Sequence, residues 1–377
     1  MPELTALPYS GDVTAIAELI GDASIVAIGE NNHHIHEFGV LRDQLLRHLV
    51  EHRGFTILGF EGGFAEGFLV DEWLRGAPGD VADVGRDGFT FSLGDSPEVH
   101  EMLTWLRGRG VRFAGLDVPS SAGSPVPSLR AIRAVAPSLV DAAIEACAPY
   151  SSVSSAVAPG LYAALGKEVR DAATEALNVL KEHLADADEV VRHHVEGALS
   201  IDTYLRELDA MMSGNATGTS ARDAYMAATV RLLRKQYPGE KIVIMLHNGH
   251  LQRIPFSPIP GMAAAPSAGT HLAAEFGDDY FALALTAVAG STTGLASDET
   301  ERLGFRVYEQ PLEEPAADGI EAALAGDAPC LADLRPVHDG PGSIRHAHLN
   351  SPVDVAAAFD AVVCLKGQET IYRATAD

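Results

Sequence analysis

The sequence contains a series of short, continuous apolar runs, each of which ends abruptly in polar residues. A run that is apolar at every position is typical of a strand buried on both faces, as in a parallel sheet. Helical patterns lie between the runs, and strands that alternate with helices indicate an α/β fold. The expected strands are residues 24–28 (SIVAI), 55–60 (FTILGF), 111–116 (VRFAGL), 241–246 (KIVIML), 280–287 (YFALALTA) and 360–365 (DAVVCL).

The intervening segments predict helices. Apolar residues recur at helical spacing over residues 37–52, and residues 65–74, 97–106 and 223–237 are similar. Residues 161–212 contain almost no Gly or Pro and are rich in Ala, Leu, Glu and Val, which favours one long helix or a helical pair.

We therefore expect an α/β protein with a mostly parallel central sheet flanked by helices. Residues 1–129 and 213–377 would form this core, and residues 130–212 would form an inserted helical subdomain over the active-site cleft. The insertion and the Pro-, Gly- and Ala-rich loop at residues 254–269 would shape the mouth of the cleft.

The excess of acidic over basic residues argues against two classes of binding partner. It has 27 Lys and Arg against 52 Asp and Glu, a formal net charge of −25 at pH 7. A nucleic-acid binder needs a basic face, and an anionic membrane repels such a charge, so we expect neither partner. The three cysteines form no CxxC motif, and no apolar run approaches a membrane span of roughly 18 residues. The first residues show no signal-peptide pattern, so we expect a cytoplasmic protein.

Acids and histidines gather where the expected strands end. In an open α/β sheet, ligands bind in the crevice outside the carboxyl ends of the strands. Side chains that follow different strands of the sheet can therefore meet at one edge, and we predict one site there. The residues at these positions are Glu30, His33, Glu61, Asp117, His247 and His250.

The segment Glu30–Glu37 is dense in Glu and His. A single His of this kind is usually a surface or capping residue, but the clustering favours a functional loop. A carboxylate beside an imidazole sets its tautomer and raises its pKa, so Glu30 and His33 together could form a general base. His34 and His36 are weaker candidates, because a cluster cannot all point one way.

The segment His247-Asn248-Gly249-His250 forms a second cluster. One interpretation is stabilisation of an oxyanion by an imidazolium or by Asn248. Another is a divalent metal held by Glu30, His33, His247 and His250, although no specific zinc spacing such as HExxH is present. Glu61 ends an apolar strand, where partial burial would perturb its pKa and let it hold or relay a proton.

Several common chemistries leave no trace in the sequence. It contains no GxSxG motif of a serine nucleophile and no GxGxxG or GxxxxGK[ST] motif for a nucleotide. Any hydrolysis would therefore use activated water rather than a serine acyl-enzyme, and no cofactor is expected.

Taken in order, these segments resemble the erythromycin esterase family over residues 24–365. The first segment is similar to the family's GExxHGxxEF pattern, and the others are similar to its "GF…E", "F.G.D", "RD..MA" and "HNxH" segments; a further segment is similar to a loop of its macrolide esterases. The corresponding residues are Gly29, Glu30, His33, Glu37, Phe38, Arg42, Gly54, Phe55, Glu61, residues 86–89 (RDGF), residues 113–117 (FAGLD), Arg222, Asp223, Met226, Ala227 and residues 247–250 (HNGH).

The resemblance implies hydrolysis of a macrocyclic lactone or another ester on an α/β core with a helical subdomain over a deep cleft. It places the water-activating base on His33, supporting carboxylates on Glu30 and Glu61, and a second histidine pair on His247 and His250. The chain departs from the pattern at His34, where the family has Gly, and at Asn31 and Asn32. Gly at that position would permit close approach of the backbone to a substrate.

We thus predict a carboxylic-ester hydrolase that acts on a small natural-product ester or lactone. His33 would take a proton from water, Glu30 would orient His33, Glu61 would hold the water, and His247 and His250 would bind the carbonyl oxygen. The other site residues would bind substrate or organise the site: Arg42, Glu37, His34, Asp117, Asn248, Arg222 and Asp223.

Two alternatives stay open. The same acid/base set could serve a non-hydrolytic tailoring enzyme of natural-product biosynthesis, namely a cyclase, dehydratase or transesterase, which would have to keep water from the reacting carbon. The histidines and acids could instead form a metal-binding protein without catalysis.

Overall fold

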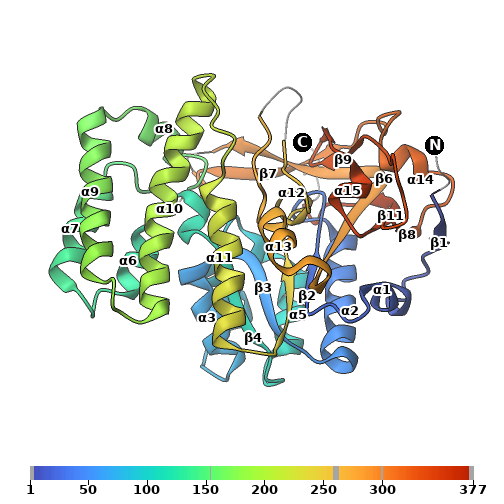
Figure 1. The fold of residues 1–377 in the computed structure, drawn as a ribbon, viewed down its shortest axis with the longest axis horizontal. Helices are drawn as coiled ribbons and strands as arrows, with labels where there is room; N and C mark the ends of the chain where they lie inside the picture. Colours follow the sequence, from blue (N-terminus) through green and yellow to red (C-terminus); the bar gives the residue numbers. More distant parts are fainter. Residues whose placement is uncertain (1–3, 153, 258–262, 299, 373–377) are drawn as a thin grey trace.

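The computed structural model describes residues 4–152, 154–257, 263–298 and 300–372 (Figure 1). Its centre is a run of six parallel strands in the order β4-β3-β5-β2-β6-β11. These are the six strands predicted from the apolar runs. Their bounds are β2 (Ile25–Ile28), β3 (Phe55–Gly63), β4 (Arg112–Asp117), β5 (Lys241–Met245), β6 (Tyr280–Ser297) and β11 (Ala361–Gln368).

Antiparallel strands extend the sheet within the described residues. β8 (Cys330–Asp333) pairs with β11, β1 (Ala6–Pro8) pairs with β8, and β7 (Phe305–Pro311) pairs with the far half of β6. A separate hairpin joins β9 (Ser343–His346) to β10 (Leu349–Pro352). The sheet is therefore mostly parallel, with an antiparallel edge.

The strands are apolar throughout because both faces of the sheet are covered. In β2, Val26 and Ile28 face one hydrophobic cluster, Ile25 and Ala27 face another, and all four are fully buried. The first cluster includes side chains of α1 (Thr14–Ile20), α2 (His36–Arg53), α3 (Phe64–Leu74), α4 (Val81–Gly88) and α5 (Pro97–Leu106). The second includes side chains of α11 (Ala221–Gln236), α12 (Asn248–Leu251), α13 (Ala268–Phe276), α14 (Ile320–Leu324) and α15 (Val355–Ala358).

The predicted helices appear as α2, α3, α5 and α11, each within two residues of the predicted ends. Short 3₁₀ turns occur at η1 (Leu93–Asp95), η2 (Pro119–Ala122) and η3 (Gly277–Asp279). The α/β fold with a central sheet flanked by helices is confirmed.

A third hydrophobic cluster joins the helices between β4 and α11, which lie at one end of the molecule in Figure 1. They are α6 (Val126–Ala131), α7 (Pro137–Cys147), α8 (Ala158–Ala163), α9 (Lys167–His183) and α10 (Glu189–Met212). Of the two structures predicted for residues 161–212, the chain forms the helical pair. The helix is interrupted after α9, and Asp188 caps the start of α10 by accepting a hydrogen bond from the Val190 amide. The division into core and insertion stays a prediction, and its boundary at residue 130 falls inside α6.

None of the helices in the described part of the chain has both the length and the apolar character needed to cross a membrane.

Glycines let α3 lie against β4, directly behind the end of β3. A Cβ on Gly67 of α3 would lie 2.3 Å from the backbone nitrogen of Gly115, and one on Gly115 would lie 2.1 Å from the carbonyl oxygen of Gly63. Backbone atoms cannot rotate away as a side chain can, so this contact requires the absence of both Cβ atoms.

We predict that Gly67→Ala lowers the free energy of unfolding by about 1–3 kcal/mol, the usual cost of overpacking. Gly160→Ala in α8 is the matched control, because nothing lies within 4 Å of its Cβ. The control should be unchanged or more stable, since Ala favours a helix over Gly by roughly 1 kcal/mol. Urea unfolding followed by circular dichroism measures both variants, and equal stabilities would contradict the packing argument.

Candidate active site

Four neighbouring strands deliver polar side chains to one edge of the sheet. Glu30 follows β2, Glu61 lies near the end of β3, Asp117 is the last residue of β4, and His247 follows β5. The strand order β2-β5-β3-β4 makes these ends adjacent, although the residues lie far apart in the sequence. These side chains therefore meet at the carboxyl ends of the strands, as the sequence predicted.

His33 is held by Glu30. Its Nδ1 lies 2.9 Å from Glu30 Oε1, and Arg42 Nη1 lies 2.7 Å from the same oxygen. Burial would raise the pKa of the Glu30 carboxyl, but Arg42 and His33 outweigh it and hold that pKa below its usual value. An ionised Glu30 accepts the Nδ1–H of His33, which leaves the Nε2 of His33 as the outward-facing nitrogen.

His250 repeats this arrangement from the opposite side. Its Nδ1 lies 2.7 Å from Asp223 Oδ1 at the start of α11. Asp223 also accepts hydrogen bonds from the Ala268 amide at 3.0 Å and from the Ser220 hydroxyl at 2.6 Å. These contacts orient the Asp223 carboxylate. Because the carboxylate binds Nδ1 of His250, the Nε2 of this ring faces the centre of the site.

Glu61 lies between the two histidines. Its Oε1 is 3.7 Å from His33 Nε2 and 3.6 Å from His250 Nε2. The same oxygen accepts from Arg222 Nη2 at 3.0 Å, and Oε2 accepts from the His247 backbone amide at 2.7 Å. Although burial opposes ionisation, His250, His33 and Arg222 hold the pKa of Glu61 far below its usual range.

Arg222 is fixed by a second carboxylate. Its Nε and Nη2 lie 3.0 and 2.6 Å from Oδ1 and Oδ2 of Asp117, a fork that fits the flat guanidinium. Asp117 is fully buried. Asp117 therefore orients the Arg222 guanidinium toward Glu61.

The charges of this cluster explain the state of its histidines. Four buried or nearly buried carboxylates face two guanidiniums, so the cluster lacks positive charge. Burial alone would lower the pKa of His33 and of His250, but the carboxylates outweigh it and raise both pKa values above the usual 6.5. The charged members are Glu30, Glu61, Asp117, Asp223, Arg42 and Arg222.

His247 has a different task from the predicted one. Its Nδ1 accepts a hydrogen bond from the Gly249 amide at 3.1 Å, so the proton lies on Nε2, which donates to the Asn31 carbonyl at 2.6 Å. Burial holds its pKa well below 6.5. Both ring nitrogens are used within the chain, so His247 ties the two loops together and has no nitrogen left for a carbonyl oxygen.

The same bonds argue against the alternative metal set of Glu30, His33, His247 and His250. A metal needs a free lone pair on His247, and the only one is taken by the Gly249 amide. Among the described residues, no group of three or more His, Cys, Asp or Glu has an arrangement that could hold a metal ion. These residues therefore do not fit a metal.

Two predicted substrate-binding residues lie outside the centre. The Asn248 amide donates to the Leu285 carbonyl at 2.9 Å and accepts from the Leu285 amide, so it joins the loop after β5 to β6. Glu37 accepts from the Glu369 amide on the surface. Both residues lie in segments that form the site, as predicted. Their side chains, however, bind backbone groups of Leu285 and Glu369 and do not face the centre of the site.

Three residues beside the centre were not predicted from the sequence. The His346 ring of β9 lies 4.3 Å from that of His247, and burial lowers the pKa of His346 to about 4. Phe91 stacks 6.3 Å from the His33 ring, and Tyr204 of α10 lies against Arg222. His346 and Tyr204 lie far from the motifs and carry no signal of their own, because only the folded chain brings them near. Phe91 follows residues 86–89 (RDGF) by two positions, so that segment pointed to the region without singling out this side chain.

A cavity of about 180 Å³ opens beside His250, Arg222 and Asp223. Its other walls come from α10, from the loop at residues 216–220 and from Phe256, Ala263, Ala265 and Ser267. The apolar part of its lining consists of Leu208, Met211, Ala216, Phe256, Ala263 and Ala265.

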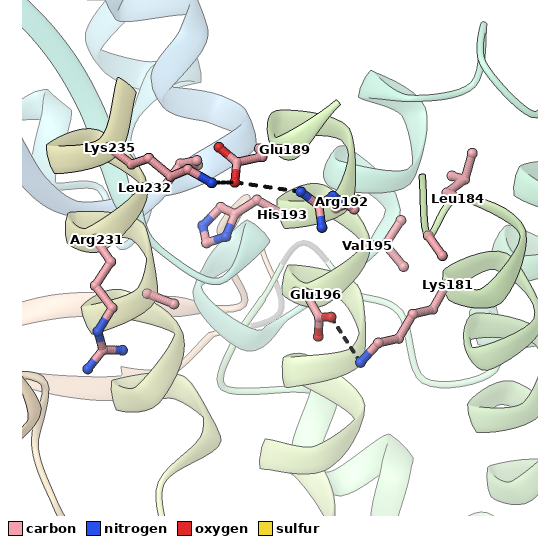
Figure 2. Close-up of a pocket in the computed structure, with 12 residues that line it drawn as sticks. Lys181, Leu184, Glu189, Arg192, His193, Val195, Glu196, Arg231, Leu232 and Lys235 are labelled. Atoms are coloured by element: carbon pink, nitrogen blue, oxygen red, sulfur yellow. Dashed lines mark hydrogen bonds and ion pairs between the residues drawn. The ribbon is translucent and has the colours of Figure 1, made fainter. Parts of the chain in front are cut away.

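A larger groove of about 460 Å³ lies elsewhere, between α9, α10 and α11 (Figure 2). Each of its four basic side chains has a carboxylate partner. Lys181 pairs with Glu196, Arg192 and Lys235 share Glu189, and Arg231 pairs with Glu275. Its charges thus link the helices to one another and to α13.

Comparison with known proteins decides the family. A family model described as "Erythromycin esterase" matches residues 50–366, most of the chain.

The chain belongs to the erythromycin esterase family.

Two curated relatives from Escherichia coli cover nearly the whole chain. Erythromycin esterase type II is 30% identical over 93% of this chain and 91% of its own length, and erythromycin esterase type I is 28% identical over 93% and 92%. As a member of the erythromycin esterase family with these relatives, the chain is an esterase-type hydrolase.

Solved structures share the fold. A mutant erythromycin esterase in its open conformation superposes with a TM-score of 0.83 at 23% identity and covers 95% of this chain and 94% of its own. A succinoglycan biosynthesis protein gives a TM-score of 0.72 at 16% identity, over 97% of this chain and 95% of its own. The fold is thus shared by proteins with different names.

We predict that Glu30→Gln lowers the pKa of His33, because an amide removes the negative charge that stabilises the imidazolium while burial continues to oppose it. NMR titration of histidine-labelled protein measures this pKa. Glu98→Gln is the control, because Glu98 contacts the exposed His36 at 2.5 Å and not His33. An unchanged or higher pKa of His33 in Glu30→Gln would refute the assigned role of Glu30.

Proposed function

We propose that this protein hydrolyses an ester bond of a macrolide-type lactone with water that His33 activates. The observation that carries the proposal is the pair of imidazole Nε2 atoms that face one oxygen of Glu61, at 3.7 and 3.6 Å. Each imidazole has a carboxylate on its Nδ1, at 2.9 and 2.7 Å. One nitrogen can thus take a proton while the other donates one.

His33 acts as the base in this proposal. Its Nδ1–H is directed at Glu30, so its Nε2 takes a proton from a water held beside Glu61 Oε1. The water oxygen then bonds to the carbonyl carbon, and the carbonyl oxygen becomes an oxyanion. Glu61 stays ionised and accepts the other hydrogen of the water, which orients its lone pair.

His250 acts as the acid. Because its pKa is raised, it can carry a proton at neutral pH and donate a hydrogen bond to the oxyanion. When the bond between the carbonyl carbon and the ester oxygen breaks, His250 gives this proton to the leaving alcohol oxygen. The products are a carboxylic acid and an alcohol, joined in one chain when the substrate is a lactone.

The proposed substrate class rests on the relatives and on the cavity wall. Both Escherichia coli relatives are named erythromycin esterases. The wall beside His250 combines Met211 and Phe256 with polar groups such as Tyr204. An apolar wall with a few placed polar groups suits an alkylated ring that carries hydroxyl groups.

The test is hydrolysis in ¹⁸O-labelled water, followed by mass spectrometry. We expect wild type to convert erythromycin, or another macrolide or smaller lactone in a panel, to a ring-opened acid that contains one ¹⁸O atom. His33→Gln should lose about 10²–10⁴-fold in kcat/KM, the usual contribution of a positioned base. His36→Gln is the matched control, because it changes an exposed His at the start of α2, three residues after His33.

The isotope also separates the alternatives. A product without ¹⁸O would overturn hydrolysis and favour a cyclase, dehydratase or transesterase. Labelled product from small lactones but not from macrolides would keep the mechanism and overturn the macrolide class. Full activity of His33→Gln would refute the base.

We predict a bell-shaped dependence of kcat/KM on pH. The rate should rise as pH increases through the raised pKa of His33, since only neutral His33 accepts a proton. It should fall at higher pH as His250 loses its proton. His250→Gln should remove the alkaline limb and keep the acidic one. A profile without an acidic limb above pH 6.5 would contradict the assigned state of His33.

A further inference from the structure

His34, the residue directly after the proposed base, has a backbone conformation that L-residues rarely adopt. Its φ is 63°, in the left-handed region that favours glycine. Phe91 and Ser92, which lie across from it, have φ values of 56° and 57°. Backbone strain of this kind persists only where the surroundings hold it, and it gathers at functional sites.

The His34 side chain is packed into the protein. It is only 9% exposed, and its ring lies edge-on to Tyr372 at 5.0 Å. Burial lowers the pKa of His34 to about 4, so the ring is neutral at physiological pH, and it also interacts with the backbone of Phe91. His34 therefore touches two segments that are distant in sequence.

The C-terminal segment is tied to the loop of His33 by backbone hydrogen bonds. The Ile371 amide donates to the His34 carbonyl at 3.0 Å, and the His36 amide donates to the Glu369 carbonyl at 2.9 Å. The Tyr372 side chain makes a hydrogen bond with the side chain of Ser92. His34, Ser92 and Tyr372 thus join three segments, and we call this group of three the clasp.

Phe91, next to Ser92, is the side chain that the clasp holds. Its ring is nearly parallel to that of His33, at 16° and 6.3 Å between centroids. The central carbon of the Arg222 guanidinium lies 5.5 Å from the Phe91 centroid. Phe91 therefore contacts both the proposed base and the cation that holds Glu61.

We propose that the clasp positions Phe91 over one face of His33, so that Phe91 forms a wall of the site beside the base and His34 and Tyr372 are positioning residues. The inference rests on the proposed function, since it takes His33 as the base. In this arrangement Phe91 limits the access of other molecules to the imidazole. His34→Gly would relieve the backbone strain and yet release Phe91.

The accessibility of the His33 imidazole can be measured without following the enzymatic reaction. Diethyl pyrocarbonate modifies accessible neutral imidazoles, and peptide mass spectrometry gives the rate at each histidine. We expect His33 to react about ten-fold faster in Phe91→Ala, His34→Gly and Tyr372→Leu, with Tyr372→Phe between these and wild type. The exposed His52 serves as the internal reference, and Tyr308→Leu on β7 is the control.

A double-mutant cycle tests whether His34 acts through Phe91. If it does, Phe91→Ala combined with His34→Gly should be no slower than Phe91→Ala alone, because interacting residues are not additive. Each single change should lower kcat by about ten-fold or more, as small misplacements of reacting groups do. The cycle uses the lactone that wild type opens, and Tyr372→Leu provides a second cycle if His34→Gly does not fold.

An unchanged His33 modification rate in Phe91→Ala and His34→Gly would overturn the proposal, as would additive effects in the cycle. These results are separable from a failure of the proposed function. If His33→Gln keeps full activity, the base assignment fails; if it is inactive and the cycle is additive, only the clasp fails. Thermal unfolding of each variant excludes a general loss of folding.

Discussion

The site depends on the burial of one ionised carboxylate. Glu61 is almost fully buried, and an unpaired charge in such a place is strongly unfavourable. Arg222, held by Asp117, and the two imidazoles at 3.6 and 3.7 Å supply the compensating charge. Removing one partner would leave buried charge without compensation, so these residues constrain one another.

The same environment sorts the histidines of the site into two classes. His33 and His250 have carboxylates on one nitrogen and face Glu61 with the other, so their pKa values are raised. The His247 ring, whose nitrogens bind backbone groups, lies edge-on to the His346 ring, and burial keeps both rings neutral. The first pair suits the proton exchange that we propose, and His247 joins its loop to that of Asn31. The chemistry thus follows from the partner of each ring rather than from the residue type.

A fold by itself does not decide which reaction a protein carries out. This fold is shared with an erythromycin esterase and with a succinoglycan biosynthesis protein, and function depends on the site placed on it. In this chain the sheet supplies the carboxylates and imidazoles from its strand ends. Residues of α10 line the cavity beside His250, and in our proposal Phe91 forms a second wall that a substrate would meet.

The sequence alone determined the parallel strands and the main helices, because continuous apolar runs and helical spacing are local patterns. It also placed the polar residues that follow these runs at the strand ends, namely Glu30, His33, Glu61, Asp117, His247 and His250. Only the tertiary structure decided what each side chain does. His247 and Asn248 bind backbone of neighbouring segments, and Phe91, Tyr204 and His346 enter from distant parts of the chain. Hydrogen-bond partners and charge compensation depend on atoms brought together across the sheet, and no local pattern records them.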